Sequence, residues 1–198
     1  MRINLPTWLT LIRLMLLPLM VIVFYLPFHG HNVAAAIIFV LAGVTDWLDG
    51  FLARRLKLAS VFGAFLDPVA DKLMVVVTLF LLVASHRGGW SDMMLAITAA
   101  IIVGREISVS ALREWMAEIG MRATVKVVFI GKLKTLMQMV ALVVLIVEHE
   151  KEARLLSLYN IGEWLLVIAG VLTIWSGLHY LRAAWPSFKT EPSRGKES

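Results

Sequence analysis

TDWLDGFLARRLKLASVFGAFLDPVADK, residues 45–72, carries four aspartates between two long apolar runs. They are Asp46, Asp49, Asp67 and Asp71. A carboxylate in or near a bilayer costs roughly 3 kcal/mol or more unless it is paired, hydrated or bound to a metal. Four acids in so apolar a setting therefore indicate a functional site, and bound divalent metal is the interpretation that we favour.

The rest of the chain has the composition of an integral membrane protein. Of its 198 residues, 60% are hydrophobic and 17% are charged, and the mean hydropathy is +0.82. Soluble domains are about half apolar and about a quarter charged. The length suits an all-α, polytopic membrane helix bundle with about six transmembrane helices of about 20 residues each. The expected spans are 8–28, 33–56, 63–84, 92–116, 125–147 and 156–180. Small residues inside them are interpreted as helix contacts, namely Gly43, Gly162, Gly170 and Gly177.

Lysines and arginines at the ends of these spans are unevenly distributed. Most lie on the side that holds both termini and the aspartates. The positive-inside rule therefore predicts that both termini and the active site face the cytoplasm. Residues 1–185 are expected to form one transmembrane domain, and residues 186–198, which are almost free of apolar side chains, a disordered cytoplasmic tail.

The net charge and the lack of cysteine limit which molecules and metal ligands the protein can use. The formal net charge is +5, but the basic residues are scattered at span ends instead of being gathered on a polar face. Anionic lipid headgroups and phosphorylated substrates are therefore better partners than nucleic acid. The absence of cysteine excludes disulfides, thiol nucleophiles and thiolate ligands, so any metal is held by oxygen or imidazole.

A 3.6-residue helical period places the acids on two faces. The first combines two carboxylates, two small residues and a cation: Asp46, Asp49, Gly50, Ala53 and Arg54. The second is formed by Gly63, Asp67 and Asp71. A short connection at residues 57–60 makes the two helices antiparallel neighbours, so we expect these faces to meet.

The residue types suit a displacement at phosphorus. Carboxylates favour Mg²⁺ or Mn²⁺, which bind a few protein oxygens together with substrate phosphate. Two ions about 3.5–4 Å apart can clamp the attacking and leaving oxygens. Gly50 and Ala53 leave the backbone bare for a substrate, and Arg54 can pair with a phosphate. The alternative, interfacial acids paired with Arg54, Arg55 and Lys72, explains one or two acids but not four.

The segment from Asp46 to Asp71 fits D-x2-D-G-x2-A-R-x8-G-x3-D-x3-D at every fixed position. It resembles the signature of the CDP-alcohol phosphotransferase family. The similarity extends over most of the chain, through four further segments: Asn4-Leu5-Pro6-Thr7 with Thr10 and Arg13; Gly104-Arg105-Glu106-Ile107; Ala111-Leu112-Arg113-Glu114-Trp115; and Gly131-Lys132-Leu133-Lys134-Thr135 with Gln138.

The resemblance implies roles for the matching residues. Asp46, Asp49 and Asp67 hold metal, and Asp71 shares a metal and acts as the general base. Two ions, Mg²⁺ or Mn²⁺, are implied. The residues that face the CDP moiety are Gly50, Ala53, Arg54, Asn4 and Thr10. The resemblance also implies a homodimeric transferase of phospholipid biosynthesis in the bacterial cytoplasmic (inner) membrane, with membrane lipids around it.

The flanking segments imply CDP-diacylglycerol and glycerol 3-phosphate as substrates, with phosphatidylglycerophosphate and CMP as products. This is the committed step toward phosphatidylglycerol and cardiolipin. Cations near the cytoplasmic ends of the fourth and fifth spans are candidates for binding the acceptor phosphate: Arg105, Arg113, Lys132 and Lys134. Alternatively, Arg105 pairs with Glu106, and the other three serve ordinary membrane topology.

Other functions stay open at this point. Inositol phosphate, serine or phosphatidylglycerol can replace glycerol 3-phosphate as acceptor, because the aspartate motif addresses only the CDP half. A cation channel or transporter would distribute its acids along a path through several spans, whereas here they cluster toward one side of the membrane. A structural membrane anchor is the third alternative.

Overall fold

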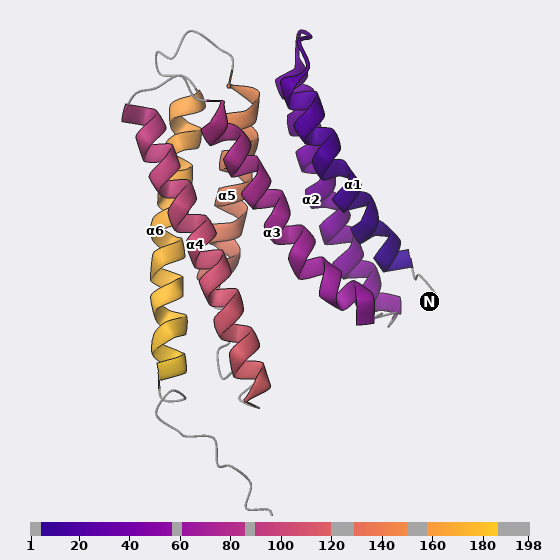
Figure 1. Cartoon of the computed structure of the whole chain (residues 1–198), viewed down its shortest axis with the longest axis vertical. Helices are drawn as coiled ribbons and strands as arrows, with labels where there is room; N and C mark the ends of the chain where they lie inside the picture. Colours follow the sequence, from indigo (N-terminus) through magenta and orange to yellow (C-terminus); the bar gives the residue numbers. More distant parts are fainter. Residues whose placement is uncertain (1–4, 57–60, 86–89, 120–128, 150–157, 186–198) are drawn as a thin grey trace, which may run out of the picture.

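The structure is a computed structural model that describes residues 5–56, 61–85, 90–119, 129–149 and 158–185. Every regular element in these ranges is an α-helix (Figure 1). The helices are α1 (Leu5–Tyr25), α2 (His31–Leu56), α3 (Val61–Ala84), α4 (Trp90–Glu118), α5 (Phe129–Val147) and α6 (Leu158–Ala184). The predicted all-α bundle is confirmed, and its helices agree with the expected spans to within a few residues.

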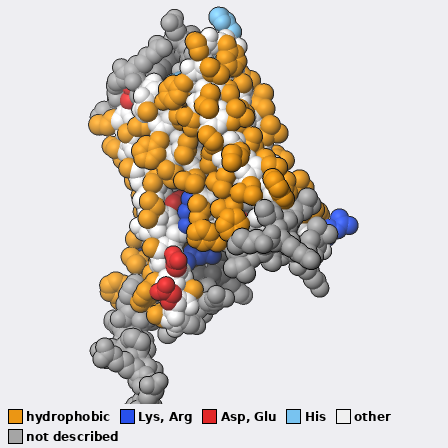
Figure 2. Space-filling view, turned by 45° about the vertical axis from the view of Figure 1, so that its right-hand side comes forward, with side chains coloured by type: hydrophobic (Ala, Val, Ile, Leu, Met, Phe, Trp, Pro, Cys, Tyr) orange, Lys and Arg blue, Asp and Glu red, His pale blue; other side chains and the backbone are white. Residues whose placement is uncertain are grey.

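Four helices are long and apolar enough to cross a membrane. Their candidate spans are Thr7–Tyr25, His31–Leu52, Ser91–Glu118 and Leu158–Arg182, in α1, α2, α4 and α6, and α5 contains a shorter apolar stretch, Leu133–Val147. Hydrophobic side chains cover most of the face shown in Figure 2. Apolar surface of this extent matches hydrocarbon as the solvent, so the chain is a polytopic membrane protein.

The bundle consists of a helix pair, a crossing helix and a group of three. Helices α1 and α2 lie side by side, and α3 runs obliquely between this pair and the group of α4, α5 and α6 (Figure 1). Helix α1 packs against both α2 and α3. Within the described ranges α2 and α3 have little direct backbone contact. The two acidic faces nevertheless meet, as expected, and side chains of α1 join them.

A tight turn sets the relation of α1 to α2. Gly30 has φ +87°, in the left-handed region that side chains other than glycine rarely adopt. The His31 amide donates to the Phe28 carbonyl, and the Ala34 amide donates to the Gly30 carbonyl, which starts α2. The chain thus reverses within a few residues, and the beginning of α1 lies beside the end of α2.

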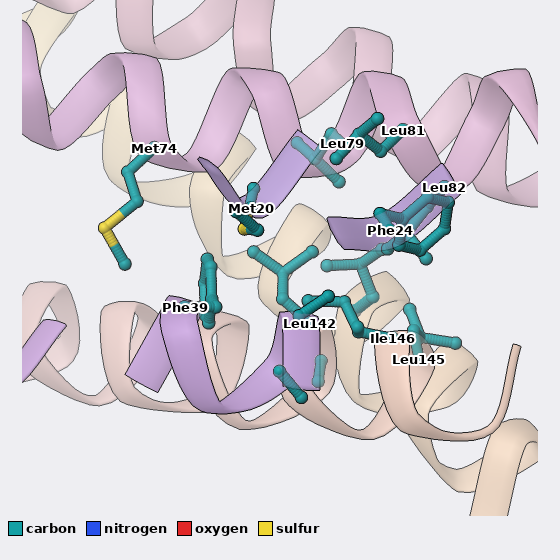
Figure 3. Close-up of a cluster of buried hydrophobic side chains, with 14 of the residues drawn as sticks. Met20, Phe24, Phe39, Met74, Leu79, Leu81, Leu82, Leu142, Leu145 and Ile146 are labelled. Atoms are coloured by element: carbon teal, nitrogen blue, oxygen red, sulfur yellow. The ribbon is translucent and has the colours of Figure 1, made fainter. Parts of the chain in front are cut away.

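The buried core has members on all six helices. Phe24 of α1, Phe39 of α2, Leu82 of α3 and Leu142 of α5 are each at most 3% exposed and face one another (Figure 3). Met74 on α3, one turn beyond Asp71, also belongs to this cluster. The apolar core therefore starts where the acidic part of α3 ends.

Glycines mark the closest helix contacts, as the sequence predicts. A Cβ added at Gly162 on α6 would lie 3.0 Å from Val144 Cγ1 on α5, and one added at Gly43 would lie 3.1 Å from Met139 Cε. Such distances are tighter than ordinary packing, so a neighbouring side chain would have to shift if a larger residue replaced the glycine. The four glycines in such contacts are Gly43, Gly162, Gly170 and Gly177.

Candidate active site

The four aspartates come together at one end of the bundle. Asp46 and Asp49 lie in the last part of α2, and Asp67 and Asp71 lie in the first part of α3. Because α1 starts at this same end, its first turns add polar side chains to the group (Figure 1). Acidic and basic side chains are concentrated toward the same part of the molecule in Figure 2.

Thr10 on α1 joins the two acidic helices. Its Oγ1 lies 2.9 Å from Asp49 Oδ2 and 2.6 Å from Asp67 Oδ1. A hydroxyl has one proton, so Thr10 can donate to one of these carboxylates at a time. Since Thr10 is fully buried and Asp49 is 3% exposed, this link lies in the dry part of the site.

Arg13, one turn further along α1, joins the other two acids. Its Nη1 lies 2.8 Å from Asp46 Oδ1 and 2.6 Å from Asp71 Oδ1, and its Nη2 lies 4.0 Å from Asp49 Oδ2. The Arg13 side chain is 0% exposed, whereas those of Asp46 and Asp71 are 47% and 51% exposed. The acids thus have an open side, and the arginine approaches them from the protein side.

Some buried polar atoms of this site do not form hydrogen bonds with other described residues. Within the described structure, Arg13 Nε, Arg13 Nη2 and Asp49 Oδ1 are buried without a hydrogen-bond partner. Native proteins rarely leave buried polar atoms in this state. Among the described side chains, the Arg13 guanidinium lies near three carboxylates, so the cluster has room for more positive charge.

Residues predicted to face CDP are only partly described. Gly50 is half-buried on α2, one position after Asp49 and on the same side of the helix as Asp46. Ala53 and Arg54 belong to α2, but their side chains lie outside the described residues, as does Asn4. Of this set, the structure places Thr10 in direct contact with the acids.

A second polar cluster links α4, α5 and α6. Glu106 Oε1 lies 3.0 Å from Arg105 Nη1 and 2.7 Å from Lys134 Nζ. Arg105 Nη2 donates to Ser176 Oγ at 2.8 Å, and its guanidinium stands 5.8 Å from the ring centre of Tyr180. The alternative in which Arg105 pairs with Glu106 is therefore observed. Because two cations share one carboxylate, the cluster still has excess positive charge.

The other acceptor candidates are placed differently. Arg113 is exposed about two turns beyond Arg105 on α4, and the Lys132 side chain lies outside the described residues. Lys72 follows Asp71 on α3, but its Nζ donates to Ser110 Oγ on α4. The alternative in which Lys72 neutralises the aspartates thus gains no support, and Lys72 instead ties the acidic site to the helix of Arg105.

Comparison with known proteins shows which family this chain resembles in sequence. The profile of CDP-alcohol phosphatidyltransferases matches residues 3–175. The chain belongs to this family. It is 52% identical over 185 residues to a protein of Yersinia pestis (strain Pestoides F), covering 93% of this chain and 97% of the relative. It is 50% identical over 189 residues to one of Pseudomonas fluorescens, covering 95% and 93%. Both relatives are named CDP-diacylglycerol–glycerol-3-phosphate 3-phosphatidyltransferase.

Members of the CDP-alcohol phosphatidyltransferase family generally use divalent metal ions. The donor set fits such an ion, because carboxylate oxygens are hard ligands and Asp49 Oδ1 is buried without a partner. As they stand in the described part of the chain, however, no three acidic or imidazole side chains are grouped closely enough to hold one ion. Arg13 and Thr10 stand between the carboxylates that the motif brings together.

Sequence reasoning missed two members of these clusters. Arg13 was placed in a family-like segment but not in the site, and Glu106 was treated only as an alternative partner of Arg105. A signal for Arg13 was available, because an arginine inside an apolar span needs an acid or a wet cavity. The same reasoning that singled out Arg105 therefore applies to Arg13.

Proposed function

We propose that this protein transfers the phosphatidyl group of CDP-diacylglycerol to glycerol 3-phosphate, forming phosphatidylglycerophosphate and CMP. The observation that carries the proposal is the complete eight-position motif, with its four aspartates gathered at one end of α1, α2 and α3. Relatives that are 50–52% identical over most of the chain carry the corresponding enzyme name, which supports the same acceptor.

The proposed roles of the aspartates follow the family resemblance. Asp46, Asp49 and Asp67, together with Asp71, would hold Mg²⁺ or Mn²⁺, with two ions proposed. When bound, such ions neutralise the diphosphate and stabilise charge on the departing CMP. Gly50, Ala53 and Arg54, with Asn4 and Thr10, would position the CDP moiety along the first turns of α1 and the last turns of α2.

Asp71 is the proposed general base. Its side chain is half-exposed, so an acceptor hydroxyl can reach it. The acceptor oxygen forms a bond to the phosphorus that bears diacylglycerol. The bond from that phosphorus to the oxygen bridging the two phosphates breaks, CMP leaves with the electron pair, and the hydroxyl proton goes to Asp71.

The second cluster is the proposed acceptor site. Arg105 and Lys134 share Glu106, and Arg105 Nε is buried without a hydrogen-bond partner in the described structure. A dianionic phosphate would therefore find unused positive charge there. Arg113 and Lys132 are added from their positions in the sequence. Lys72, which contacts Ser110 one turn from Glu106, connects this site to Asp71.

Further parts of the proposal concern the setting. The transmembrane domain spans residues 1–185, residues 186–198 form a cytoplasmic tail, and both termini and the site face the cytoplasm of a bacterial inner membrane. The unequal distribution of basic residues supports this orientation. A homodimer is proposed from the family resemblance. A cation transporter is less well supported, because the acids lie at one end of the bundle.

Acceptor competition tests the function. Purified protein is given CDP-diacylglycerol, Mg²⁺ or Mn²⁺, and radiolabelled glycerol 3-phosphate, with inositol phosphate, serine or phosphatidylglycerol in excess as competitors. We expect labelled phosphatidylglycerophosphate in every mixture and no lipid product from the competitors alone. A product from another acceptor, with none from glycerol 3-phosphate, would replace the proposed acceptor while keeping the chemistry.

A further inference from the structure

We propose that Arg13 is a built-in counter-cation, which holds the carboxylates together while no divalent ion is bound and releases Asp46 and Asp71 when one enters. The inference rests on the proposed metal-dependent function and extends it to a residue outside the aspartate motif. Arg13 is thus a positioning residue, because it acts through the acids.

The position of Arg13 is that of a substitute for an ion. A single nitrogen, Nη1, makes both short contacts, 2.8 Å to Asp46 Oδ1 and 2.6 Å to Asp71 Oδ1. These oxygens belong to two helices that have little backbone contact of their own in the described ranges. One point of positive charge therefore bridges α2 and α3, as a metal ion would.

The Arg13 guanidinium makes fewer hydrogen bonds among the aspartates than a purely structural arginine would. Among the described residues, Arg13 Nε and Nη2 are buried without hydrogen-bond partners, and Nη2 stands 4.0 Å from Asp49 Oδ2. Buried arginines that serve only structure normally have their donors satisfied, since the desolvation cost is otherwise not recovered. In the same described part of the chain, Asp49 Oδ1 also lacks a hydrogen-bond partner, although Arg13 stands nearby.

The charge of the site and its exposure to solvent explain how a divalent ion could replace Arg13 at Asp46 and Asp71. Four neighbouring carboxylates repel one another, so the metal-free protein needs a cation among them. Among the described side chains, the single Arg13 guanidinium compensates only part of that charge, which favours a divalent ion. Asp46 and Asp71 are about half exposed, whereas Arg13 is covered on the α1 side. An ion can therefore enter from the open side and take over the two carboxylates while Arg13 stays inside the bundle.

The test compares metal-free wild type with Arg13→Gln and Arg13→Lys, and with Arg182→Gln as the control. Arg182 is an exposed arginine in the last turn of α6, so its replacement removes the same charge away from the site. Mn²⁺ binding is followed by electron paramagnetic resonance of the free ion, and thermal unfolding is measured without and with saturating Mn²⁺.

Removing a competing charge should strengthen metal binding. For Arg13→Gln we expect a Kd for Mn²⁺ lowered about tenfold. Its melting temperature should fall below that of wild type without Mn²⁺ and approach it with Mn²⁺. Arg13→Lys should lie between wild type and Arg13→Gln in both measurements, and Arg182→Gln should match wild type.

Two results separate this inference from the function on which it rests. If Arg13→Gln binds Mn²⁺ no more tightly than wild type and loses the same stability with and without Mn²⁺, Arg13 is a fixed structural residue and the inference is wrong. If Arg13→Gln does not fold, Arg13→Lys is used for the test. A Kd for Mn²⁺ equal to that of wild type would then contradict the inference. If wild type itself binds no Mn²⁺ but releases CMP, the proposed metal dependence fails instead.

Discussion

Asp71, like Asp46, is exposed and has a cationic partner. It is 51% exposed and contacts Arg13, whereas Asp49 is buried against Thr10. A proton acceptor must meet the incoming hydroxyl, while a ligand can be buried. Exposure therefore allows Asp71 to act as the base, and the family resemblance is what assigns this role to Asp71 in preference to Asp46.

Asp71→Asn should abolish turnover while leaving CDP-diacylglycerol binding largely intact. A positioned general base contributes roughly 10²–10⁴-fold, so kcat should fall at least about a hundredfold. Initial rates of CMP release measure the loss, and isothermal titration measures the binding. Glu118→Gln, an exposed acid at the end of α4, is the control and should keep wild-type rates. Full activity of Asp71→Asn would remove Asp71 from the mechanism.

Thr10→Val should destabilise the metal-free protein. The replacement keeps the shape of Thr10 but removes the hydroxyl that lies between Asp49 and Asp67. Losing a buried partner of charged groups costs about 1–3 kcal/mol, which lowers the melting temperature. Thr10→Ser keeps the hydroxyl and should melt near wild type. Equal melting temperatures for the two variants would mean that the hydroxyl contacts contribute no stability.

The spacing of residues in the sequence predicted which helix faces carry the aspartates, but not which side chains contact them. The 3.6-residue period was enough to put Asp46 and Asp49 on one face and Asp67 and Asp71 on another, because a helix fixes which of its residues share a side. Spacing within a helix contains no information about a third helix. The insertion of Thr10 and Arg13 between the faces therefore had to come from the structure.

At the scale of the helices, close contacts at glycine positions help to stabilise the bundle. Gly162→Ala should lower stability, because the new Cβ would lie 3.0 Å from Val144 Cγ1 and 3.1 Å from Leu145 Cγ. Leu145 is fully buried and has little space to move. Overpacking of this kind costs about 1–3 kcal/mol.

Gly104→Ala is the matched control, since a Cβ there meets nothing within 4 Å. Alanine is the better helix former by roughly 0.5–1 kcal/mol, so this variant should melt at or above the wild-type temperature. Thermal unfolding in detergent compares the two variants. A Gly162→Ala protein as stable as Gly104→Ala would show that α5 and α6 can separate without cost.

The helices themselves were largely predictable, and their packing was not. Long apolar runs separated by polar turns indicate where α1 to α6 begin and end, because in hydrocarbon the backbone must satisfy its own hydrogen bonds. A short connection at residues 57–60 suggested that α2 and α3 pack together. In the structure α1 packs against both α2 and α3, while α2 and α3 have little direct backbone contact in the described ranges.

For the whole molecule, orientation is the property that places the site. The chain has no cysteine, so single cysteines report their own side of the membrane. His29→Cys, in the exposed turn between α1 and α2, should react with a membrane-impermeant maleimide in intact cells. Ser193→Cys should react only after the membrane is opened. The reverse pattern would place the aspartates on the outer side and contradict the proposed topology.

CMP release by the purified protein is the most direct measurement of the central proposal, a phosphatidyl transfer that depends on the four aspartates and a divalent ion. With CDP-diacylglycerol and Mn²⁺, we predict CMP formation only when glycerol 3-phosphate is present, in equal amount to phosphatidylglycerophosphate. Chelation should stop it, and added Mg²⁺ or Mn²⁺ should restore it. CMP release that continues at the same rate after chelation, or no release with glycerol 3-phosphate under either ion, would contradict this account.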